Sequence, residues 1–514
     1  MLLAKPLLMT ALCLSFLSGC SLPPLDKRSE STALTPEQSA DTPLGRGIAP
    51  VAAAHPGKSG IHPLPNAYDA FAARMMLARA AERSLDVQYY IWHNDMTGTM
   101  LLEALHEAAD RGVRVRLLLD DNGTAGLDPV LSALNEHANI EVRLYNPFVL
   151  RWPKPLGYVT DFKRLNRRMH NKSFTADNQA TIIGGRNIGD EYFGATTDVL
   201  FTDLDVLAIG AAVNDVSMDF DRYWASDSAY PVDRLLKPAE PGALQALAQQ
   251  ASKVERSPEA AAYAEAMRQL PFIRQLMQGD LTLEWATTRM VSDDPRKTLG
   301  TAPPEAMLPH QLHEIIGAPK TDLELVSPYF VPTATGTEAF AKLAQRGVKV
   351  QVLTNALEAT DVAVVHSGYA KRRKDLLASG IELFEMKRKA GGVERNKSMG
   401  PFGSSGSSLH AKTFAVDGER IFVGSFNFDP RSATLNTELG FVIDSPTLAG
   451  HIAQAFKQDI PNVAYRVCLD DKGDLYWLEQ RDGKTIRHDT EPGTTMWKRF
   501  SVWFVSLLPL EPLL

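Results

Sequence analysis

Hydrophobic positions along this chain follow two periods that alternate in order. From Asn66 to Arg83 they recur at the spacing of an amphipathic helix, and the apolar run from Leu85 to Trp92 is typical of a buried strand. A second helix is expected over Met100 to Arg111, ended by Gly112, and a second buried strand over Val113 to Leu119. Helices that alternate with buried strands predict an α/β fold, in which a mixed or parallel sheet has helices on both faces.

The same order of segments occurs again in the second half of the chain. AADRGVRVRLLLDD at 108–121 is matched by LAQRGVKVQVLTN at 343–355. A polar pattern follows in each half: His, Lys two residues on, Asp five further, then Gly-Gly or Gly-Ser, any residue, and Asn. The first copy is His170, Lys172, Asp177, Gly184, Gly185 and Asn187, and the second is His410, Lys412, Asp417, Gly424, Ser425 and Asn427. We therefore predict one duplicated αβ unit.

Each copy of the polar pattern is expected to form a strand, a turn and a second strand. Residues i and i+2 of a strand project from the same face, so the His and Lys of each copy should be neighbours. Asp417 and Gly418 form a hairpin-turn signal, and Asp177 occupies the equivalent place in the first copy. The simplest role for both aspartates is therefore structural or orienting.

The residue types of the pattern point to chemistry on a phosphate ester. Lys has no lone pair to give and repels a metal ion beside His, so we predict no metal site. Lys and Asn bind the nonbridging oxygens, and glycine lets the backbone approach closely. One His must be neutral to attack phosphorus, and the other must be protonated to give its proton to the leaving oxygen. A covalent phosphohistidine then divides the reaction into two displacements, with a carboxylate expected to orient each His.

These paired motifs resemble the phospholipase D superfamily, in which the two halves of one chain meet to form a single site. Nearly the whole of residues 66 to 514 further resembles its bacterial cardiolipin synthase branch, closest to the C-type enzyme, in stretches such as DVQYYIW, RLNRRMHNKSF and GSFNFDPRS. The resemblance implies two phospholipase D-like αβα sandwich repeats, each a mixed sheet flanked by helices, packed around one shared active site. It also implies that no metal or organic cofactor is needed.

The resemblance assigns roles to particular residues. The catalytic set comprises His170, Lys172, Asp177, His410, Lys412 and Asp417, with His170 the nucleophile, and the phosphate-binding set comprises Asn187, Asn427, Gly185 and Ser425. Glu438 matches the carboxylate that supports a His. In the first half Asp203 is the better counterpart, although Asp198 has the same offset of eleven residues from its Asn as Glu438. His366 and Tyr369 are candidates to line the pocket.

The N-terminus has the features of a targeting segment. Lys5 precedes an apolar run from Pro6 to Leu17 that is shorter than the roughly 20 residues of a membrane-spanning helix, and Leu-Ser-Gly-Cys follows, ending at Cys20. This resembles a bacterial lipoprotein signal, with Cys20 acylated; the alternative is an ordinary secretory signal with an incidental Cys. Ser21 resembles the sorting pattern for outer-membrane lipoproteins. We therefore predict a lipoprotein anchored in a membrane and facing the periplasm of a Gram-negative bacterium, at the outer or the inner membrane.

Composition and spacing divide the remainder of the chain. We predict a signal peptide (1–19), a flexible tether after Cys20 (20–65), a first repeat (66–234), a helical inter-repeat segment (235–300), a second repeat (301–460) and a C-terminal extension (461–514). The chain ends in an apolar stretch, Phe500 to Leu508, with aromatic neighbours. This stretch either docks on the body or lies in a membrane interface.

Residues 145–168 combine aromatic and basic side chains just before His170. The aromatic and aliphatic members are Phe148, Val149, Leu150, Trp152, Leu156 and Tyr158, and the basic members are Arg151, Lys154, Lys163, Arg164, Arg167 and Arg168. This mixture suits a lipid headgroup region. The alternative is a loop packed on the body with a solvated charged face.

Net charge limits the range of substrates. The formal charge is −7 at pH 7, which argues against a protein that binds nucleic acid nonspecifically. The first hypothesis is therefore transfer of a phosphatidyl group to phosphatidylglycerol, from phosphatidylglycerol or phosphatidylethanolamine, to make cardiolipin. The alternatives are hydrolysis of phospholipids to phosphatidic acid and, less favoured, a nuclease of the same superfamily.

Overall fold

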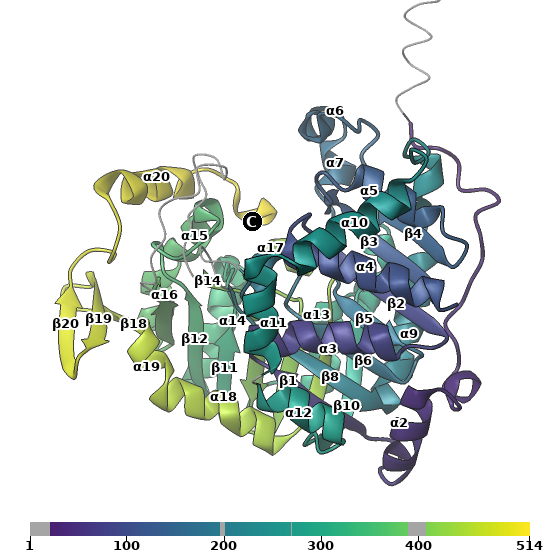
Figure 1. Ribbon diagram of the computed structural model, residues 1–514. Helices are drawn as coiled ribbons and strands as arrows, with labels where there is room; N and C mark the ends of the chain where they lie inside the picture. The colour runs from purple at the N-terminus through teal and green to yellow at the C-terminus, as the bar shows by residue number, and fades with distance from the viewer. Residues whose placement is uncertain (1–20, 196–200, 269, 389–407) are drawn as a thin grey trace, which may run out of the picture.

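The computed structural model describes residues 21–195, 201–268, 270–388 and 408–514. The predicted signal peptide, Cys20 and Asp198 lie outside these ranges. Figure 1 shows the two halves of the chain side by side, each with a sheet and its own helices.

The first half contributes nine strands and eight helices among the described residues. The strands are β1 (Ser59–Leu64), β2 (Ser84–Ile91), β3 (Arg114–Gly123), β4 (Ile140–Tyr145), β5 (Ser173–Ala176), β6 (Ala180–Gly184), β7 (Phe201–Thr202), β8 (Asp205–Gly210) and β9 (Ala229–Pro231). The helices are α2 (Pro43–Ala53), α3 (Ala67–Ala80), α4 (Met96–Asp110), α5 (Asp128–Asn135), α6 (Gly157–Thr160), α7 (Phe162–Leu165), α8 (Asp190–Phe193) and α9 (Ala211–Trp224).

The segment between the repeats and the second half follow the same plan. The connecting elements are α10 (Ala243–Glu255), α11 (Pro258–Arg268), α12 (Pro271–Gln278), β10 (Glu284–Ser292) and α13 (Leu308–Ile316). The second-half strands are β11 (Asp322–Val326), β12 (Lys349–Asn355), β13 (Glu382–Met386), β14 (Ser408–Leu409), β15 (Thr413–Val416), β16 (Arg420–Gly424), β17 (Leu439–Asp444), β18 (Ala464–Leu469), β19 (Leu475–Arg481) and β20 (Lys484–His488). The helices are α14 (Thr333–Gln345), α15 (Ala363–Ala370), α16 (Arg373–Ala378), α17 (Pro430–Thr434), α18 (Pro446–Gln458), α19 (Ile460–Val463) and α20 (Met496–Ser506).

Strand pairing repeats in the two halves. In the first, β4, β3 and β2 are parallel neighbours, and β5, β6 and β8 continue the sheet antiparallel to one another. In the second, β13, β12 and β11 are parallel, followed by β15, β16 and β17 in the same antiparallel arrangement. β1 pairs with both β8 and β10, and β10 pairs with β17. The duplication predicted from the sequence is thus present in the topology, and β1 and β10 join the two sheets.

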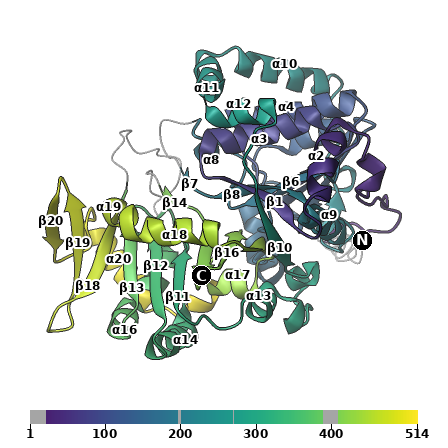
Figure 2. The ribbon, with the colours of Figure 1, turned by 90° about the horizontal axis from the view of Figure 1, so that it is seen from below.

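Local sequence explains where these elements begin and which faces they bury. Asn66 caps α3, because its side-chain oxygen accepts hydrogen bonds from the backbone N–H groups of Tyr68 and Asp69. Strands β2 and β3 are buried along most of their length, as expected for parallel strands covered on both faces. In Figure 2, α18 lies on one side of the second sheet and α14 and α16 on the other. The predicted α/β fold with a mixed sheet between helices is therefore confirmed.

An apolar layer joins the repeats. Ile61, Ile183 and Val206 from the first half pack in one cluster with Ile421 and Phe441 from the second. These residues lie on the central strands of the joined sheet, beside the position where the two polar motifs meet. Burial of this layer fixes the motifs relative to each other.

Residues 21–65 do not form the flexible tether that the sequence predicted. They contribute α2 and β1, and β1 pairs with β8 over its whole length. Ser39 is buried, and Ile61 is completely buried in the inter-repeat layer. The Pro, Gly and Ala content of this stretch is typical of a linker. The single strand from Ser59 to Leu64 is too short to show a hydrophobic period that would indicate otherwise.

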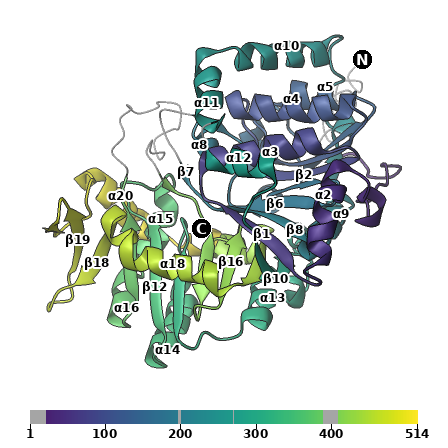
Figure 3. The ribbon, with the colours of Figure 1, turned by 60° about the horizontal axis from the view of Figure 1, so that its bottom comes forward.

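Two other predicted boundaries differ from the structure. The inter-repeat segment is helical through α10, α11 and α12, which Figure 3 shows beside α3 and α4, but it also contains the long strand β10. The C-terminal extension begins with β18, which pairs with β13 as β9 pairs with β4. Among the described residues, no helix is long and apolar enough to cross a bilayer.

Candidate active site

The two motifs lie at the centre of the molecule, each in the extended chain just before a hairpin. His170 and Lys172 immediately precede β5, and His410 and Lys412 connect β14 to β15. The aspartates lie at the other end of each hairpin's first strand, in the left-handed backbone region with φ of 52° and 56°. This matches the predicted strand, turn and strand, except that the His and Lys positions precede the regular strand.

The carboxylates of Asp177 and Asp417 face the protein backbone. Asp177 accepts hydrogen bonds from the N–H groups of Glu82, Arg83 and Ser84, just before β2. Asp417 does the same for the N–H groups of Lys320 and Thr321, just before β11. Both aspartates thus tie their hairpin to the neighbouring strand and do not join the histidines, which corrects their inclusion in the catalytic set.

Each motif histidine is held by a carboxylate from the other repeat. His170 Nδ1 lies 2.8 Å from Glu438 Oε2, and His410 Nδ1 lies 2.6 Å from Asp203 Oδ2. Both carboxylates are buried, and the two histidines are only 7% and 6% exposed. Since Nδ1 is engaged in each ring, Nε2 is the nitrogen left for chemistry.

Backbone contacts repeat this exchange between the repeats. The N–H of His170 donates to the carbonyl of Thr437, and the N–H of His410 donates to the carbonyl of Thr202. β14 pairs in parallel with β7, and Met169 forms a parallel bridge with Thr437. Each motif therefore lies beside the segment of the other repeat that carries its carboxylate.

Gly185 and Ser425 support the carboxylates. A Cβ atom at Gly185 would come within 2.1 Å of Asp203 Oδ1, so glycine leaves the space that this carboxylate fills. At the matching position, the Ser425 hydroxyl donates to Glu438 Oε2, and Ser432 donates to Glu438 Oε1. Both positions thus support the carboxylates, and the phosphate-binding role of Gly185 and Ser425 stays a prediction.

The two lysines are buried beside their histidines. Lys172 Nζ donates to the carbonyl of His170 at 2.6 Å, and Lys412 Nζ donates to the carbonyl of His410. An ammonium carries three donors, so this contact uses one and leaves capacity to bind anionic oxygens.

The two asparagines differ in their contacts. Asn187 accepts a hydrogen bond from the N–H of Ile91 and donates to the Tyr192 hydroxyl. The side-chain oxygen of Asn427 is buried and has no hydrogen-bond partner in the described part of the chain. A buried amide group without a partner is expected where a polar ligand binds.

Burial and the surrounding charges shift the pKa values differently in the two histidine–carboxylate pairs. Burial lowers the pKa of His170 well below its ordinary value, with further lowering by Lys172, Lys412 and His410, while burial raises the pKa of Glu438 to about 7. Burial also lowers the pKa of His410, followed by Lys412, but Asp203 opposes this change. The pKa of Asp203 is held below its ordinary value because His410 and Lys412 outweigh the effect of burial. His170 is therefore neutral in the resting site, while His410 faces an ionised carboxylate.

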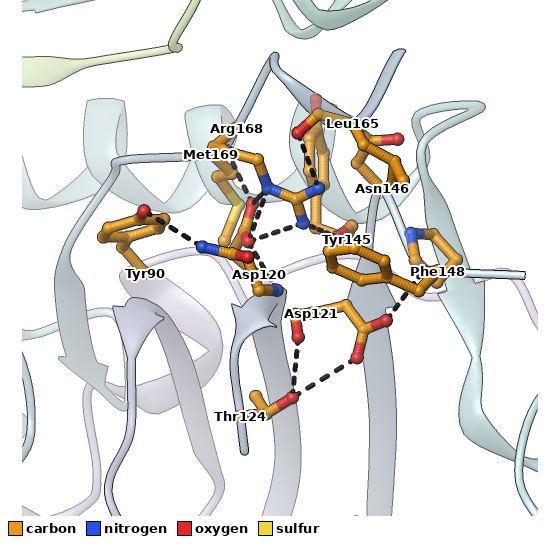
Figure 4. A network of polar contacts seen from close by, with 12 residues as sticks. Tyr90, Asp120, Asp121, Thr124, Tyr145, Asn146, Phe148, Leu165, Arg168 and Met169 are labelled. Atoms are coloured by element: carbon orange, nitrogen blue, oxygen red, sulfur yellow. Dashed lines mark hydrogen bonds and ion pairs between the residues drawn. The ribbon is translucent and has the colours of Figure 1, made fainter. Parts of the chain in front are cut away.

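A buried ion pair positions the backbone that leads to His170 (Figure 4). The Arg168 guanidinium donates to both oxygens of Asp120, at the end of β3, and Asp120 also accepts from the N–H of Met169. Arg168 is 2% exposed and Asp120 is completely buried. The sequence LLLDD at 117–121 indicates a role for Asp120, because acids near the carboxyl end of a buried strand commonly face a functional site.

Most basic residues of 145–168 are at least partly buried, although Lys163 is exposed, and this favours a loop packed on the body over contact of these cations with lipid headgroups. Arg151 and Lys154 pair with the buried carboxylate of Asp121, and Arg164 pairs with Asp161. The aromatic side chains of this segment behave differently, because Trp152 is 86% exposed. The ion pairs therefore hold the segment on the body, and the apolar side chains of Leu150, Trp152 and Leu156 remain exposed, whereas Phe148 is buried.

Aromatic rings not predicted from the sequence complete the walls of the site. The Tyr90 ring lies edge-on to His170 at 5.0 Å, and Tyr192 lies edge-on to His410 at 5.2 Å, with Phe201 at 5.1 Å. Tyr90 belongs to the YYIW run of β2, where a hydrophobic strand pattern gives no sign of a functional role.

His366 and Tyr369, the predicted pocket residues, lie on α15 in a different polar cluster. His366 Nε2 is 3.3 Å from Glu491 Oε1 and 3.0 Å from an Arg373 nitrogen, and its ring lies edge-on to Tyr369. These contacts connect α15 to the C-terminal extension. The role of His366 and Tyr369 in a pocket stays a prediction.

A group with metal-ligand character lies outside the two motifs. Within the described ranges, His93, Asp95 and Glu191 bring a nitrogen and two carboxylates within 4.8 Å of one another. His93 Nδ1 already pairs with Glu191 at 3.0 Å. The motif histidines, each beside a lysine, do not offer such a set.

The Asp120–Arg168 pair can be tested separately from the chemistry. Asp120→Asn leaves the buried Arg168 guanidinium without its counter-charge, so we expect a loss of about 3–5 kcal/mol in the free energy of unfolding. Asp161→Asn, which breaks the more exposed Asp161–Arg164 pair, should cost less than about 1 kcal/mol. Urea denaturation of both variants measures the difference, and equal costs would show that the Asp120 pair has no special structural weight.

Comparison with known proteins identifies the family. The family model for the cardiolipin synthase PLD-like domain matches residues 75–224 and again 312–460. Cardiolipin synthase C of Escherichia coli (strain K12) is 50% identical over 471 residues, which cover 92% of this chain and 99% of that protein. A cardiolipin synthase of Staphylococcus aureus (strain Mu50) is 24% identical over 385 residues, 74% of this chain and 63% of that protein.

A solved structure shares the fold. The crystal structure of phosphatidylserine synthase from Haemophilus influenzae Rd KW20 matches with a TM-score of 0.55 at 14% identity, covering 92% of this chain and all of that one. At this identity the likeness concerns the fold. From the family match and the 50% identity over nearly the whole length, the chain belongs to the cardiolipin synthase family of phospholipase D-like phosphatidyltransferases.

Proposed function

We propose that this protein makes cardiolipin by transphosphatidylation through a phosphohistidine at His170. Phosphatidylglycerol is the acceptor, and phosphatidylglycerol or phosphatidylethanolamine is the donor. The observation that supports this most directly is the pairing of two histidines, each with a carboxylate from the opposite repeat, beside two buried lysines. That arrangement provides one nucleophile, one proton donor and two cations for a phosphodiester.

In the first displacement, Nε2 of neutral His170 attacks the phosphorus of the donor lipid. The bond between phosphorus and the headgroup oxygen breaks, and protonated His410 gives its proton to that oxygen, which leaves as glycerol or ethanolamine. Lys172, Lys412 and the Asn427 amide bind the nonbridging oxygens. The products of this step are a phosphatidyl group on His170 and a neutral His410.

In the second displacement, His410 accepts the proton of a glycerol hydroxyl of phosphatidylglycerol. The oxygen of that hydroxyl attacks phosphorus, the phosphorus–nitrogen bond to His170 breaks, and cardiolipin forms. Water in place of this hydroxyl gives phosphatidic acid, which is the alternative phospholipase D reaction. The low exposure of both histidines favours transfer, because it limits the access of bulk water.

The difference between the two carboxylates supports the assignment of roles. The pKa of Glu438 is raised to about 7 and the pKa of His170 is lowered, so Glu438 does not stabilise a protonated His170. Asp203 stays ionised and opposes the lowering of the His410 pKa by burial and Lys412. His170 is thus suited to attack and His410 to carry the proton.

Lipid products test the reaction. Purified protein in mixed phosphatidylethanolamine and phosphatidylglycerol vesicles should form cardiolipin in excess of phosphatidic acid, as measured by mass spectrometry, and supplying one lipid at a time identifies the donor. His170→Ala and His410→Ala should each lower turnover by about 10⁴-fold or more. Phosphatidic acid as the main product would establish hydrolysis instead, and substantial activity in either variant would exclude the two-histidine mechanism.

The pH profile tests the role of Asp203. Because Asp203 raises the pKa of His410, Asp203→Asn should lower that pKa, so His410 loses its proton at a lower pH. We expect reduced activity and an alkaline limb of kcat displaced to lower pH. Glu438→Gln is the matched control: activity falls, but the alkaline limb keeps its position. An unmoved alkaline limb in Asp203→Asn would remove His410 as the proton donor.

We also propose that the protein is a membrane lipoprotein facing the periplasm, acylated at Cys20. The Leu-Ser-Gly-Cys sequence that ends at Cys20 supports this. Arg28 donates to the carbonyls of Ser226 and Ala229, and Ala229 pairs with Tyr145, so the chain enters beside the segment that carries α6.

Labelling tests the acylation. Cells given an alkyne-tagged palmitate should incorporate the tag into the wild-type protein, and Cys20→Ser should remove it, while Cys468→Ser, the matched control, leaves it in place. Equal labelling of the wild type and Cys20→Ser would show that this sequence is an ordinary secretory signal.

A further inference from the structure

Two segments far apart in the sequence expose large apolar side chains. The first, residues 150–162, exposes Leu150, Trp152, Leu156, Val159 and Phe162, and the second, residues 496–508, exposes Met496, Trp497, Phe500, Trp503, Phe504, Leu507 and Leu508. Trp152 and Val159 are 86% and 83% exposed, and Trp497 is 74% exposed. Contiguous patches of this kind are rare on soluble monomers and mark interaction surfaces.

Both segments lie on one side of the molecule. In Figure 1, α6 and α7 rise at the top of the first half and α20 lies at the top of the second, with α17 and the C-terminus between them. In Figure 2, seen from below, α20 lies behind the second sheet. We call residues 150–162 and 496–508 together the upper face.

Polar contacts connect the two parts of the upper face. The Arg431 guanidinium donates to the backbone and side-chain oxygens of Asn166, the residue that ends α7. The same guanidinium donates to the carbonyl of Leu513, and the N–H of Arg431 donates to the carbonyl of Leu514. Arg431 follows Asn427 by four residues, so the residues just after each segment are linked to each other beside the second motif.

The first segment also leads directly to the first catalytic motif. Tyr158 on α6 donates to the side-chain oxygen of Asn122 at 3.0 Å, and the Asn122 amide contacts the Tyr90 hydroxyl at 3.4 Å. The Tyr90 ring packs edge-on against His170 and lies 5.6 Å from the Lys172 ammonium. Two side chains, Asn122 and Tyr90, therefore connect Tyr158 of α6 to the His170 ring.

In both segments the charged side chains are paired with the body and the apolar side chains are exposed, which is the reverse of an ordinary surface loop. In the first, Arg151 and Lys154 pair with buried Asp121 while Trp152 points to solvent. Just after the second, Glu511 pairs with Arg372, and within α20 only Val502 is buried. Ion pairs therefore hold both segments on the body, and their apolar side chains remain on the outside.

We propose that the upper face inserts into the surface of a phospholipid bilayer and presents lipid headgroups to His170 and His410. The exposed Trp and Phe side chains suit the boundary between headgroups and acyl chains, where indole rings concentrate. An amphipathic surface of this kind reaches about 5–10 Å below the headgroups. This inference rests on the proposed function in one respect, namely that the substrate is a membrane lipid.

Tryptophan fluorescence tests whether both segments insert. Vesicles of phosphatidylethanolamine and phosphatidylglycerol that carry a shallow doxyl-labelled lipid should quench Trp152 in the Trp497→Phe, Trp503→Phe variant. They should also quench the indoles of α20 in Trp152→Phe. Quenching of one segment alone would overturn the single insertion face.

Vesicle flotation and activity test the consequence. Residues 21–514 of the chain, which lack the acylated position, should float with the same vesicles. The Trp152→Ser, Val159→Ser and Trp497→Ser, Trp503→Ser double variants should each lower partitioning by about tenfold. Met218→Ser, which changes an exposed apolar residue of α9 outside the upper face, is the matched control and should float like the wild type.

A monomeric substrate distinguishes loss of the membrane contact from loss of the fold or the chemistry. Both double variants should turn over dihexanoyl phosphatidylglycerol, below its micelle concentration, at the wild-type rate while losing activity on vesicles in proportion to flotation. Wild-type flotation by the double variants, or a change in oligomeric state instead, would identify the upper face as a protein contact. If the wild type turns over neither substrate, the proposed function fails, and flotation and quenching still decide the membrane contact.

Discussion

The exchange of carboxylates between the repeats is the interaction on which the site depends. His170 lies against Glu438 and His410 against Asp203, so each motif histidine takes its carboxylate from the opposite repeat. All four groups are buried, and a buried charge that loses its partner costs about 3–5 kcal/mol. The apolar layer between the sheets and the parallel bridges at Thr437 and Thr202 therefore do more than join two domains. They bring each ring to the carboxylate that orients it.

Duplication created two similar motifs, and small differences around them give the motifs different properties. Where the second repeat has Ser425, which donates to Glu438, the first has Gly185, whose missing side chain lets Asp203 approach. The same polar skeleton thus holds one carboxyl whose pKa is raised to about 7 and another that stays ionised. A reaction that needs a neutral histidine and a protonated one can use this asymmetry, because both residues are supplied by one ancestral pattern.

Sequence patterns predicted what is local or repeated. The helix after Asn66, the strands before and after Gly112 and the two hairpins each follow from a short window of residues. Glu438 and Asp203 were chosen as carboxylates, but which histidine each would face depends on how the repeats pack, which no local pattern records. The tether was wrong for the same reason, since Ser59 to Leu64 becomes a strand only because β8 and β10 provide partners. Asp177 was placed among the catalytic residues by motif spacing, whereas its contacts belong to the turn.

The buried site and the apolar upper face meet two linked requirements of the proposed reaction, exclusion of water and access for a lipid. A phosphohistidine that must meet a lipid hydroxyl before water benefits from a closed site, and both histidines are nearly inaccessible to solvent. A lipid with two acyl chains, however, gains nothing by crossing water to reach such a site. Tyr158, Asn122 and Tyr90 connect the exposed apolar segment to His170, so in the proposed reaction the headgroup would have a short way to the ring while the chains remain in an apolar phase. Exclusion of water and access for lipid then follow from the same surface.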